Sequence, residues 1–225
     1  MSIIHKFRTN HGLRIFASKV YTLVGGNSSN LKGKGNQLVT KGTFRRHCKF
    51  RVYGDNNRIV FAESIYGIRN VVINIFGNNN LIQIGKNFAT DGLCFSIEDD
   101  NNKIIVGENC HGGVNSELAA IEGTNIVLGD DCMLSANITV RTGDSHSVLN
   151  AQSKQRINPS KSVVIGEHVW IGNTVLIFKG AEIGSHSVVA GGSVVTGKQF
   201  PDNCIIGGNP AKIIKEGVDW CSERI

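Results

Sequence analysis

An aliphatic residue recurs at every sixth position in the C-terminal third of the chain, and this spacing limits the fold more than any other feature. A period of six matches neither the 3.6-residue turn of an α-helix nor the alternation of one long strand. It suits a short strand, a corner and a second short strand, so it predicts a parallel β-helix built from hexapeptides. The repeated residues are Ile165, Ile171, Ile177, Ile183, Val189 and Val195, with an earlier set at Leu128, Leu134 and Val140.

A longer period of about 22 residues precedes the hexapeptides. Similar segments begin at Asn57, Asn80, Asn102 and Asn125, and glycines 85, 107 and 129 lie 22 residues apart. Three hexapeptides make a coil of 18 residues, so these longer coils are expected to carry about four extra residues at one corner. Asparagine and glycine suit corners because both tolerate positive φ.

One interval interrupts the repeat. Gly129 and Gly166 are 37 residues apart, and the polar run between them lacks the aliphatic period. We interpret residues 141–162 as a long loop inserted at a corner of one coil. Long loops on rigid scaffolds often carry function.

The two ends of the chain differ from the repeats. Residues 1–23 place apolar side chains at near-helical spacing, which predicts a helix with a basic polar face. This helix would either cap the first coil or lie on an anionic membrane surface. We therefore expect a basic N-terminal cap (1–33), a β-helix domain (34–200) and a C-terminal tail (201–225) that folds back on the last coils.

Composition excludes several classes. The 27 glycines among 225 residues and only 3 prolines indicate many regular turns. The net charge is +6, yet residues 1–54 carry eleven basic residues and no acidic one, so the remainder is mildly acidic. No apolar run approaches a membrane span, and no secretory signal begins the sequence, so we expect a cytoplasmic protein, with a position at the inner face of the cell membrane as the alternative. Nucleic-acid binding is not expected, because no known module is present.

The six cysteines form no metal-binding pair. They stand at positions 48, 94, 110, 132, 204 and 221, without a C-x-x-C motif. Buried, reduced thiols are the main expectation, and a disulfide framework is the alternative.

Three motifs in order resemble a known family. The hexapeptides from Val163 to Thr196, the loop motif Arg141-Thr-Gly-Asp-Ser-His-Ser and the closing Gly-Asn-Pro-Ala-Lys resemble the left-handed β-helix acyltransferases. The similarity is to the galactoside and maltose acetyltransferase branch and its capsular-polysaccharide O-acetyltransferase relatives. It implies an all-β, left-handed parallel β-helix with a long active-site loop and short helical segments at the termini. It also implies a homotrimer that binds acetyl-CoA between neighbouring β-helices.

The resemblance assigns catalytic roles within the loop and the first hexapeptides. His146 matches the catalytic histidine and would act as general base toward an acceptor hydroxyl, for which imidazole has a suitable pKa. Trp170 would line the tunnel near His146, and a main-chain N–H near Gly172 and Asn173 would stabilise the oxyanion. The alternatives are a solvated loop histidine and a surface tryptophan packed on the loop.

Further positions match the cosubstrate and acceptor sites of that family. Asn173, Gly191 and Thr196 correspond to pantetheine contacts. Lys212 and Lys215 correspond to a phosphate-binding pair, although both would equally suit a solvated tail. For the sugar acceptor the candidates are Asn115, Glu117 and Asp144. The usual carboxylate partner of the asparagine is not matched, because Glu122 and Gly123 occupy the aligned positions.

The expected function is therefore transfer of acetyl from acetyl-CoA to a hydroxyl of a capsular or other surface polysaccharide, or its precursor. N-acetylation of an amino sugar or small amine is the main alternative, and a non-catalytic β-helix scaffold is another. A further alternative on this fold is zinc-dependent hydration, with His168 and His186 as ligands and His111 as the candidate third ligand. No metal is expected, since stacking of two coils explains the 18-residue spacing of His168 and His186.

Overall fold

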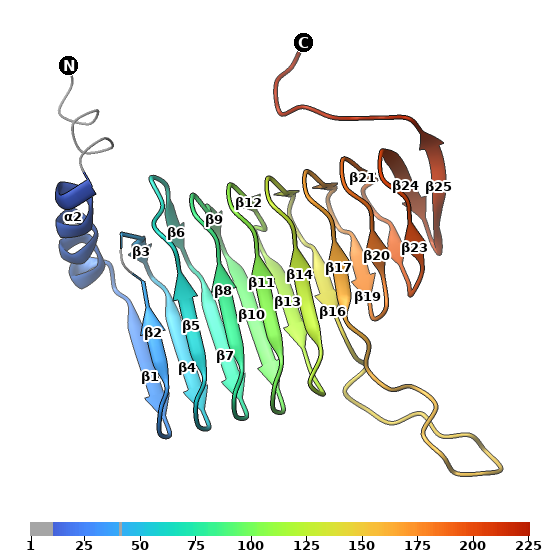
Figure 1. Cartoon of the computed structure of the whole chain (residues 1–225), viewed down its shortest axis with the longest axis horizontal. Helices are drawn as coiled ribbons and strands as arrows, with labels where there is room; N and C mark the ends of the chain where they lie inside the picture. Colours follow the sequence, from blue (N-terminus) through green and yellow to red (C-terminus); the bar gives the residue numbers. More distant parts are fainter. Residues whose placement is uncertain (1–10, 41) are drawn as a thin grey trace.

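The computed structural model describes residues 11–40 and 42–225, and most of them form a β-solenoid of parallel strands (Figure 1). Each coil passes through three faces in turn, and each face is a sheet in which consecutive coils are neighbours. We call these faces A, B and C/D, the last consisting of a short sheet C followed by sheet D. Within the described ranges no helix has the length and apolar character needed to span a membrane.

Faces A and B contain eight strands each, so the solenoid has eight coils. Face A comprises β1 (Ser28–Lys32), β4 (Lys49–Tyr53), β7 (Val72–Phe76), β10 (Leu93–Glu98), β13 (Ser116–Ala120), β16 (Thr139–Arg141), β19 (Leu176–Phe178) and β22 (Val194–Val195). Face B comprises β2 (Gln37–Val39), β5 (Arg58–Phe61), β8 (Leu81–Ile84), β11 (Lys103–Val106), β14 (Asn125–Leu128), β17 (Val163–Ile165), β20 (Glu182–Ile183) and β23 (Gln199–Phe200).

Face C/D closes each coil. Sheet C contains β3 (Phe44–Arg46), β6 (Gly67–Arg69) and β9 (Thr90–Asp91). Sheet D contains β12 (His111–Gly112), β15 (Met133–Leu134), β18 (Trp170–Ile171), β21 (Val188–Val189), β24 (Cys204–Gly208) and β25 (Ala211–Glu216). A bridge between Ala89 and His111 joins the two sheets into one face.

The predicted hexapeptide positions form the core. All nine aliphatic residues of the repeat are buried, with Val140, Ile171, Ile177, Val189 and Val195 fully inaccessible to solvent. Parallel register places equivalent residues of successive coils about 4.8 Å apart, so each aliphatic side chain packs on those above and below. The structure therefore confirms the coil length and the inward direction of these side chains, as the hydrophobic period predicted.

Buried asparagines stabilise the corner between faces A and B. The side-chain oxygens of Asn57, Asn80 and Asn102 accept from the backbone N–H one coil further on, at 2.8 to 3.0 Å. Their amide groups donate to carbonyls such as that of Asp99. In the next coil Thr124 occupies the buried position, and its N–H donates to Asn102, while Asn125 lies one residue further on. The ladder satisfies backbone groups at the extra residues of the long coils.

The corner between face B and face C/D uses positive φ at one non-glycine residue in each of the last six coils. Asn87, Asn109, Asp131, His168, His186 and Asn203 occupy it, with φ between 51° and 57°. Non-glycine residues in this conformation are most often Asn, Asp or His. This requirement explains why His168 and His186 lie 18 residues apart.

The N-terminal helix α2 (His11–Val24) lies beside β3 at the start of the solenoid (Figure 1). Arg14 donates to the Glu63 carboxylate at 2.7 Å and ties the helix to the second coil. The helix predicted over residues 1–23 is thus present from His11, while residues 1–10 lie outside the described ranges. Membrane contact by this segment stays a prediction.

The C-terminal end departs from the expected short helix. β25 is a strand that pairs antiparallel with β24 and covers the last open edge of sheet D. Gly207 and Gly208 precede the turn, and the β-branched pair Ile213 and Ile214 favours extended backbone. The chain does fold back on the last coils as predicted, but an unpaired strand edge selects a strand rather than a helix.

The cysteines are free, as predicted, but not all are buried. Cys48, Cys110, Cys132 and Cys204 are in the core, Cys94 is half-buried and Cys221 is exposed. Burial fails for Cys94 because it points outward from β10, and for Cys221 because it lies in the C-terminal tail beyond the solenoid.

The asparagine ladder leads to a stability prediction. Replacing Asn80 by Ala removes the acceptor for the Asn102 N–H and the donor to the Asp99 carbonyl. Each unsatisfied buried group costs about 1–3 kcal/mol, so the free energy of unfolding should fall by about 2–4 kcal/mol in a urea titration. Asn74→Ala, on the outer side of β7, is the matched control and should change it by less than about 0.5 kcal/mol. Equal effects of the two substitutions would contradict a structural role for the ladder.

Candidate active site

The inserted loop, residues 142–162, leaves the solenoid at the corner between faces A and B and projects from the body (Figure 1). It is a hairpin closed by an antiparallel bridge between Leu149 and Arg156. Arg156 donates to Glu122 at 2.6 Å, and the second Glu122 oxygen accepts from the Ser160 N–H. The Arg156 side chain lowers the pKa of Glu122, so the carboxylate stays ionised and holds the loop. From the sequence, Glu122 was noted only as a residue at the position where the family's acceptor-site carboxylate is not matched.

A second contact fixes the base of the loop. The Asp144 carboxylate accepts from the Lys179 ammonium and from the Asn158 amide, and these partners lower its pKa. Asp144 therefore connects the two arms of the hairpin with the next coil. Lys179 and Asn158 were not predicted, because their role depends on a contact across 35 residues of sequence.

His146 is exposed on this braced loop. Its backbone N–H donates to the Asp144 carbonyl and its own carbonyl accepts from Asn158, both at 2.8 Å. These bonds hold the backbone on both sides of the residue, while the imidazole faces solvent. The arrangement presents a histidine at a defined position without burying it.

A small pocket of about 100 Å³ lies on the outer side of face A next to the base of the loop. Glu117 lines it and accepts from Arg141 at 2.8 Å and from Ser96 at 3.2 Å. Gly143 and Ser145 from the loop complete one wall. Of the predicted acceptor residues, Glu117 is therefore beside the loop of His146. Asn115 is at a corner, where its amide donates to Asn137 at 2.7 Å.

Trp170 lies on another face of the solenoid. It is 37 % exposed on β18 of face C/D, and its indole N–H donates to Ser135 at 3.3 Å. The loop of His146 leaves from the corner between faces A and B, which is opposite face C/D in a three-sided solenoid. One chain thus does not bring His146 and Trp170 together, and the predicted proximity requires a second copy.

The predicted cosubstrate residues gather in the last coils. The Asn173 carbonyl accepts from the Gly192 N–H at 2.8 Å, and a Cβ on Gly191 would lie 3.1 Å from that oxygen. Thr196 is exposed just after β22, and Lys212 is exposed on β25. Lys215 is also exposed. It pairs with Ile205, which lies in the same row of sheet D as Val188 and Trp170. Trp170 and Lys215 therefore share one row of face C/D.

The C-terminal tail crosses face C/D beside Trp170. Trp220 stacks on His168 with ring centroids 4.3 Å apart, and its indole donates to the His168 carbonyl at 2.8 Å. The nitrogen Nδ1 of His168 is 2.6 Å from Asp131, and Nε2 is 2.8 Å from the Trp220 carbonyl. Burial lowers the pKa of His168, but these two acceptors raise it above the ordinary value. A charged imidazole can donate to both acceptors at once.

His168, His186 and Asp219 place one ligand atom each within 4.8 Å of one another. The third member of this group is an aspartate from the tail, whereas the zinc alternative required a histidine. His111 lies on β12 and not in this group. The contacts of His168 with Asp131 and with the Trp220 carbonyl hold the tail against face C/D.

The raised pKa of His168 predicts pH-dependent docking of the tail. Docking of the tail raises the pKa of His168 above the ordinary value of about 6.5. The protonated imidazole therefore stabilises the docked tail fully below about pH 6.5, and this stabilisation is lost as pH rises through the raised pKa. In a Trp170→Phe background, Trp220 fluorescence should shift to the red as pH rises above about 6.5 and through the raised pKa of His168, because the tail then detaches. His168→Gln should show the shifted spectrum throughout. An emission maximum that stays constant with pH would contradict this role of His168. The other titratable groups facing the tail here are Glu167, His186 and Asp219.

Comparison with known proteins identifies the family. The hexapeptide repeat of succinyl-transferase matches residues 103–141 and 162–197. A polysialic acid O-acetyltransferase of Neisseria meningitidis is 36 % identical over 169 residues, covering 75 % of this chain and 77 % of that protein. One from Escherichia coli O1:K1 is 33 % identical over 139 residues, 62 % of this chain and 44 % of that protein. The chain therefore spans less than half of that longer relative.

Two crystal structures have the same solenoid. A polysialic-acid-specific acetyltransferase is 29 % identical, with a TM-score of 0.74 and coverage of 88 % of this chain and 90 % of that one. A polysialic acid O-acetyltransferase is 28 % identical, with a TM-score of 0.77 and coverage of 86 % and 92 %. Together with the sequence similarity, they confirm the left-handed fold, and the chain belongs to the hexapeptide-repeat, left-handed β-helix acyltransferases.

Proposed function

We propose that the protein transfers an acetyl group from acetyl-CoA to a hydroxyl of a surface polysaccharide or its precursor. The names of the relatives support the acetyl group and the glycan, since two are polysialic acid O-acetyltransferases. The observation that carries the proposal is the braced loop, which holds the backbone of an exposed His146 from both sides. The reaction is assigned to the cytoplasm, where acetyl-CoA is made.

His146 acts as the general base. Its neutral imidazole accepts the proton of the acceptor hydroxyl as the hydroxyl oxygen attacks the thioester carbonyl. The tetrahedral intermediate collapses by breaking the carbon–sulfur bond, and the imidazolium returns the proton to the departing thiolate. The products are the acetyl ester and free coenzyme A. A backbone N–H near Gly172 and Asn173 stabilises the oxyanion.

The site forms between copies of the chain in a homotrimer. His146 of one copy meets Trp170 of its neighbour, because a single solenoid holds these residues on different sides. Acetyl-CoA occupies the groove between the two solenoids. Asn173, Gly191 and Thr196 contact its pantetheine arm, and Lys212 and Lys215 contact its phosphates as point charges.

The acceptor sugar binds at the base of the loop. Glu117, in the small pocket beside Arg141, accepts from a sugar hydroxyl. Asp144 positions the loop through Lys179 and Asn158 and orients His146 indirectly. Asn115 contributes from the neighbouring corner of face A.

Removal of the base tests the chemistry. His146→Ala should lower kcat by about 10²- to 10⁴-fold, because the hydroxyl then loses its proton to water. The measurement is thiol release from acetyl-CoA in the presence of glycan acceptors, with oligomeric state determined for each variant. Gln152→Ala, on the exposed part of the same loop, is the control and should retain full activity. Near-normal turnover by the alanine variant would exclude His146 as the base.

Mixing two inactive variants tests the shared site. His146→Ala and Trp170→Ala should each be inactive alone, but trimers assembled from an equal mixture should recover activity. In a ring of heterologous interfaces, about a quarter of the interfaces would combine an intact histidine with an intact tryptophan. The measurement is turnover after dissociation and reassembly. No recovery, with mixed trimers demonstrated by mass spectrometry, would mean that both residues act within one chain.

A further inference from the structure

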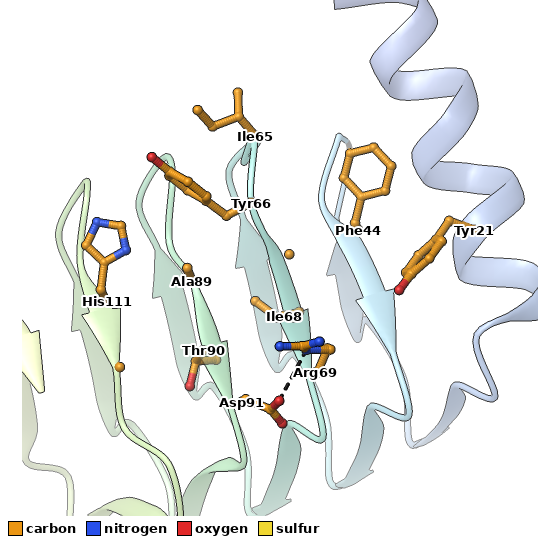
Figure 2. A pocket seen from close by; sticks show the side chains of 12 residues that line it. Tyr21, Phe44, Ile65, Tyr66, Ile68, Arg69, Ala89, Thr90, Asp91 and His111 are labelled. Carbon is orange, nitrogen blue, oxygen red and sulfur yellow. Dashed lines mark ion pairs between the residues drawn. The ribbon is translucent and has the colours of Figure 1, made fainter. Parts of the chain in front are cut away.

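A cavity of about 610 Å³ opens on face C/D beside the N-terminal helix, away from the loop of His146 (Figure 2). Its volume is in the range typical of small-molecule sites. Tyr21 from α2 lies at one end, and Tyr66, His111 and Arg69 border the rest (Figure 2). None of these residues has a role in the proposed chemistry.

The cavity follows from side-chain size along one register row. This row contains Phe44, Gly67, Ala89 and His111 on successive coils. Gly67 and Ala89 in the middle are small and form the floor of the cavity, whereas the rings of Phe44 and His111 rise at its two ends. The hollow is therefore a consequence of the sequence at four positions one coil apart.

Aromatic side chains form the walls. Tyr66 is 45 % exposed and meets His111 edge to face, with centroids 5.4 Å apart. Tyr21 meets Phe44 edge to face at 5.8 Å. Rings held in this way present rigid apolar surfaces at low entropic cost, which suits the flat C–H faces of a pyranose ring.

One edge of the cavity carries oriented charge. The Arg69 Nε lies 3.2 Å from Asp91, whose other oxygen accepts from Asn70 at 2.6 Å. The Arg69 side chain is 58 % exposed, and its terminal N–H groups have no hydrogen-bond partner among the described residues. Asp91 offsets the charge of Arg69 at the cavity itself, and Arg46, outside the lining, is next to Arg69 in the same row and adds one positive charge nearby. An arginine fork matches a carboxylate.

The cavity is aligned with Trp170. His111 pairs with Met133, and Met133 pairs with Trp170, so the cavity and the indole lie on one row two coils apart. At about 4.8 Å for each coil, the separation along the face is about 10 Å. A glycan chain lying along this face would reach both places.

We propose that this cavity binds a carboxylate-bearing pyranose of the acceptor glycan while a nearby sugar of the same chain is acetylated beside Trp170. The inference rests on the proposed function and adds the subsite that would select a polymer over a single sugar. The ring lies on Gly67 and Ala89 between the aromatic walls, and Arg69 binds its carboxylate. Helix α2 supplies one wall through Tyr21.

The test fills the cavity without changing its charge. Ala89→Leu places a larger side chain on the floor, and Gln83→Leu, on β8 of face B in the same coil, is the matched control. With oligosialic acid as acceptor, Ala89→Leu should raise KM for the acceptor by about tenfold, the effect of losing one well-placed contact. The KM for acetyl-CoA and kcat at saturation should not change. Arg69→Gln should weaken the same acceptor but not its carboxyl-reduced form.

Direct titration of oligosialic acid without acetyl-CoA separates this inference from the function. If wild type transfers acetyl normally and Ala89→Leu has an unchanged acceptor KM, the subsite is wrong and the function stands. If no acceptor is acetylated but wild type still binds the oligosaccharide more tightly than Ala89→Leu, the function fails and the subsite stands. A changed oligomeric state in Ala89→Leu but not in Gln83→Leu would identify the cavity as a subunit contact and overturn the proposal.

Discussion

Every part of this molecule depends on parallel coils stacking in exact register. Each coil donates backbone hydrogen bonds to the next on three faces, so a residue is always above its equivalent from the preceding coil. The same spacing that pairs the strands also aligns the corners. Wherever a corner needs a polar partner, the equivalent residue one coil away supplies it, as in the ladder of Asn57, Asn80 and Asn102. Regular stacking thus satisfies buried polar groups that a single coil would leave unpaired.

The same geometry restricts where functional side chains can lie. Strands are short and their inner positions are committed to the core, so functional side chains are restricted to outer rows, corners and inserted loops. An outer row aligns residues along the solenoid, as from His111 through Met133 to Trp170, but it cannot join two faces. A loop can leave its own solenoid and reach another. The hairpin with His146 projects in this way, and its contacts through Glu122 and Asp144 hold it in one position relative to its own solenoid.

Much of the fold could be predicted because the repeat is local. The six-residue period identified the buried positions, and the longer period indicated extra residues at one corner. The asparagine ladder was not foreseen, and the prediction of a short helix at the C-terminus was wrong, because neighbouring coils decided both outcomes. Thr124 fills the ladder position, and the open edge of sheet D pairs with β25. Neither result is visible within a short stretch of sequence.

For the site, the sequence alone determined which residues are candidates, because the resemblance to the acetyltransferases singles out His146 and Trp170 one at a time. Only the tertiary structure decided which residues are neighbours. It placed Glu122 and Lys179 against the loop, Asp219 beside His168, and a hollow over Gly67 and Ala89. The physical reason is that periodicity is set by each residue and its own coil. Contacts across a corner or a face instead depend on the stacking of several coils, which brings together side chains far apart in the chain.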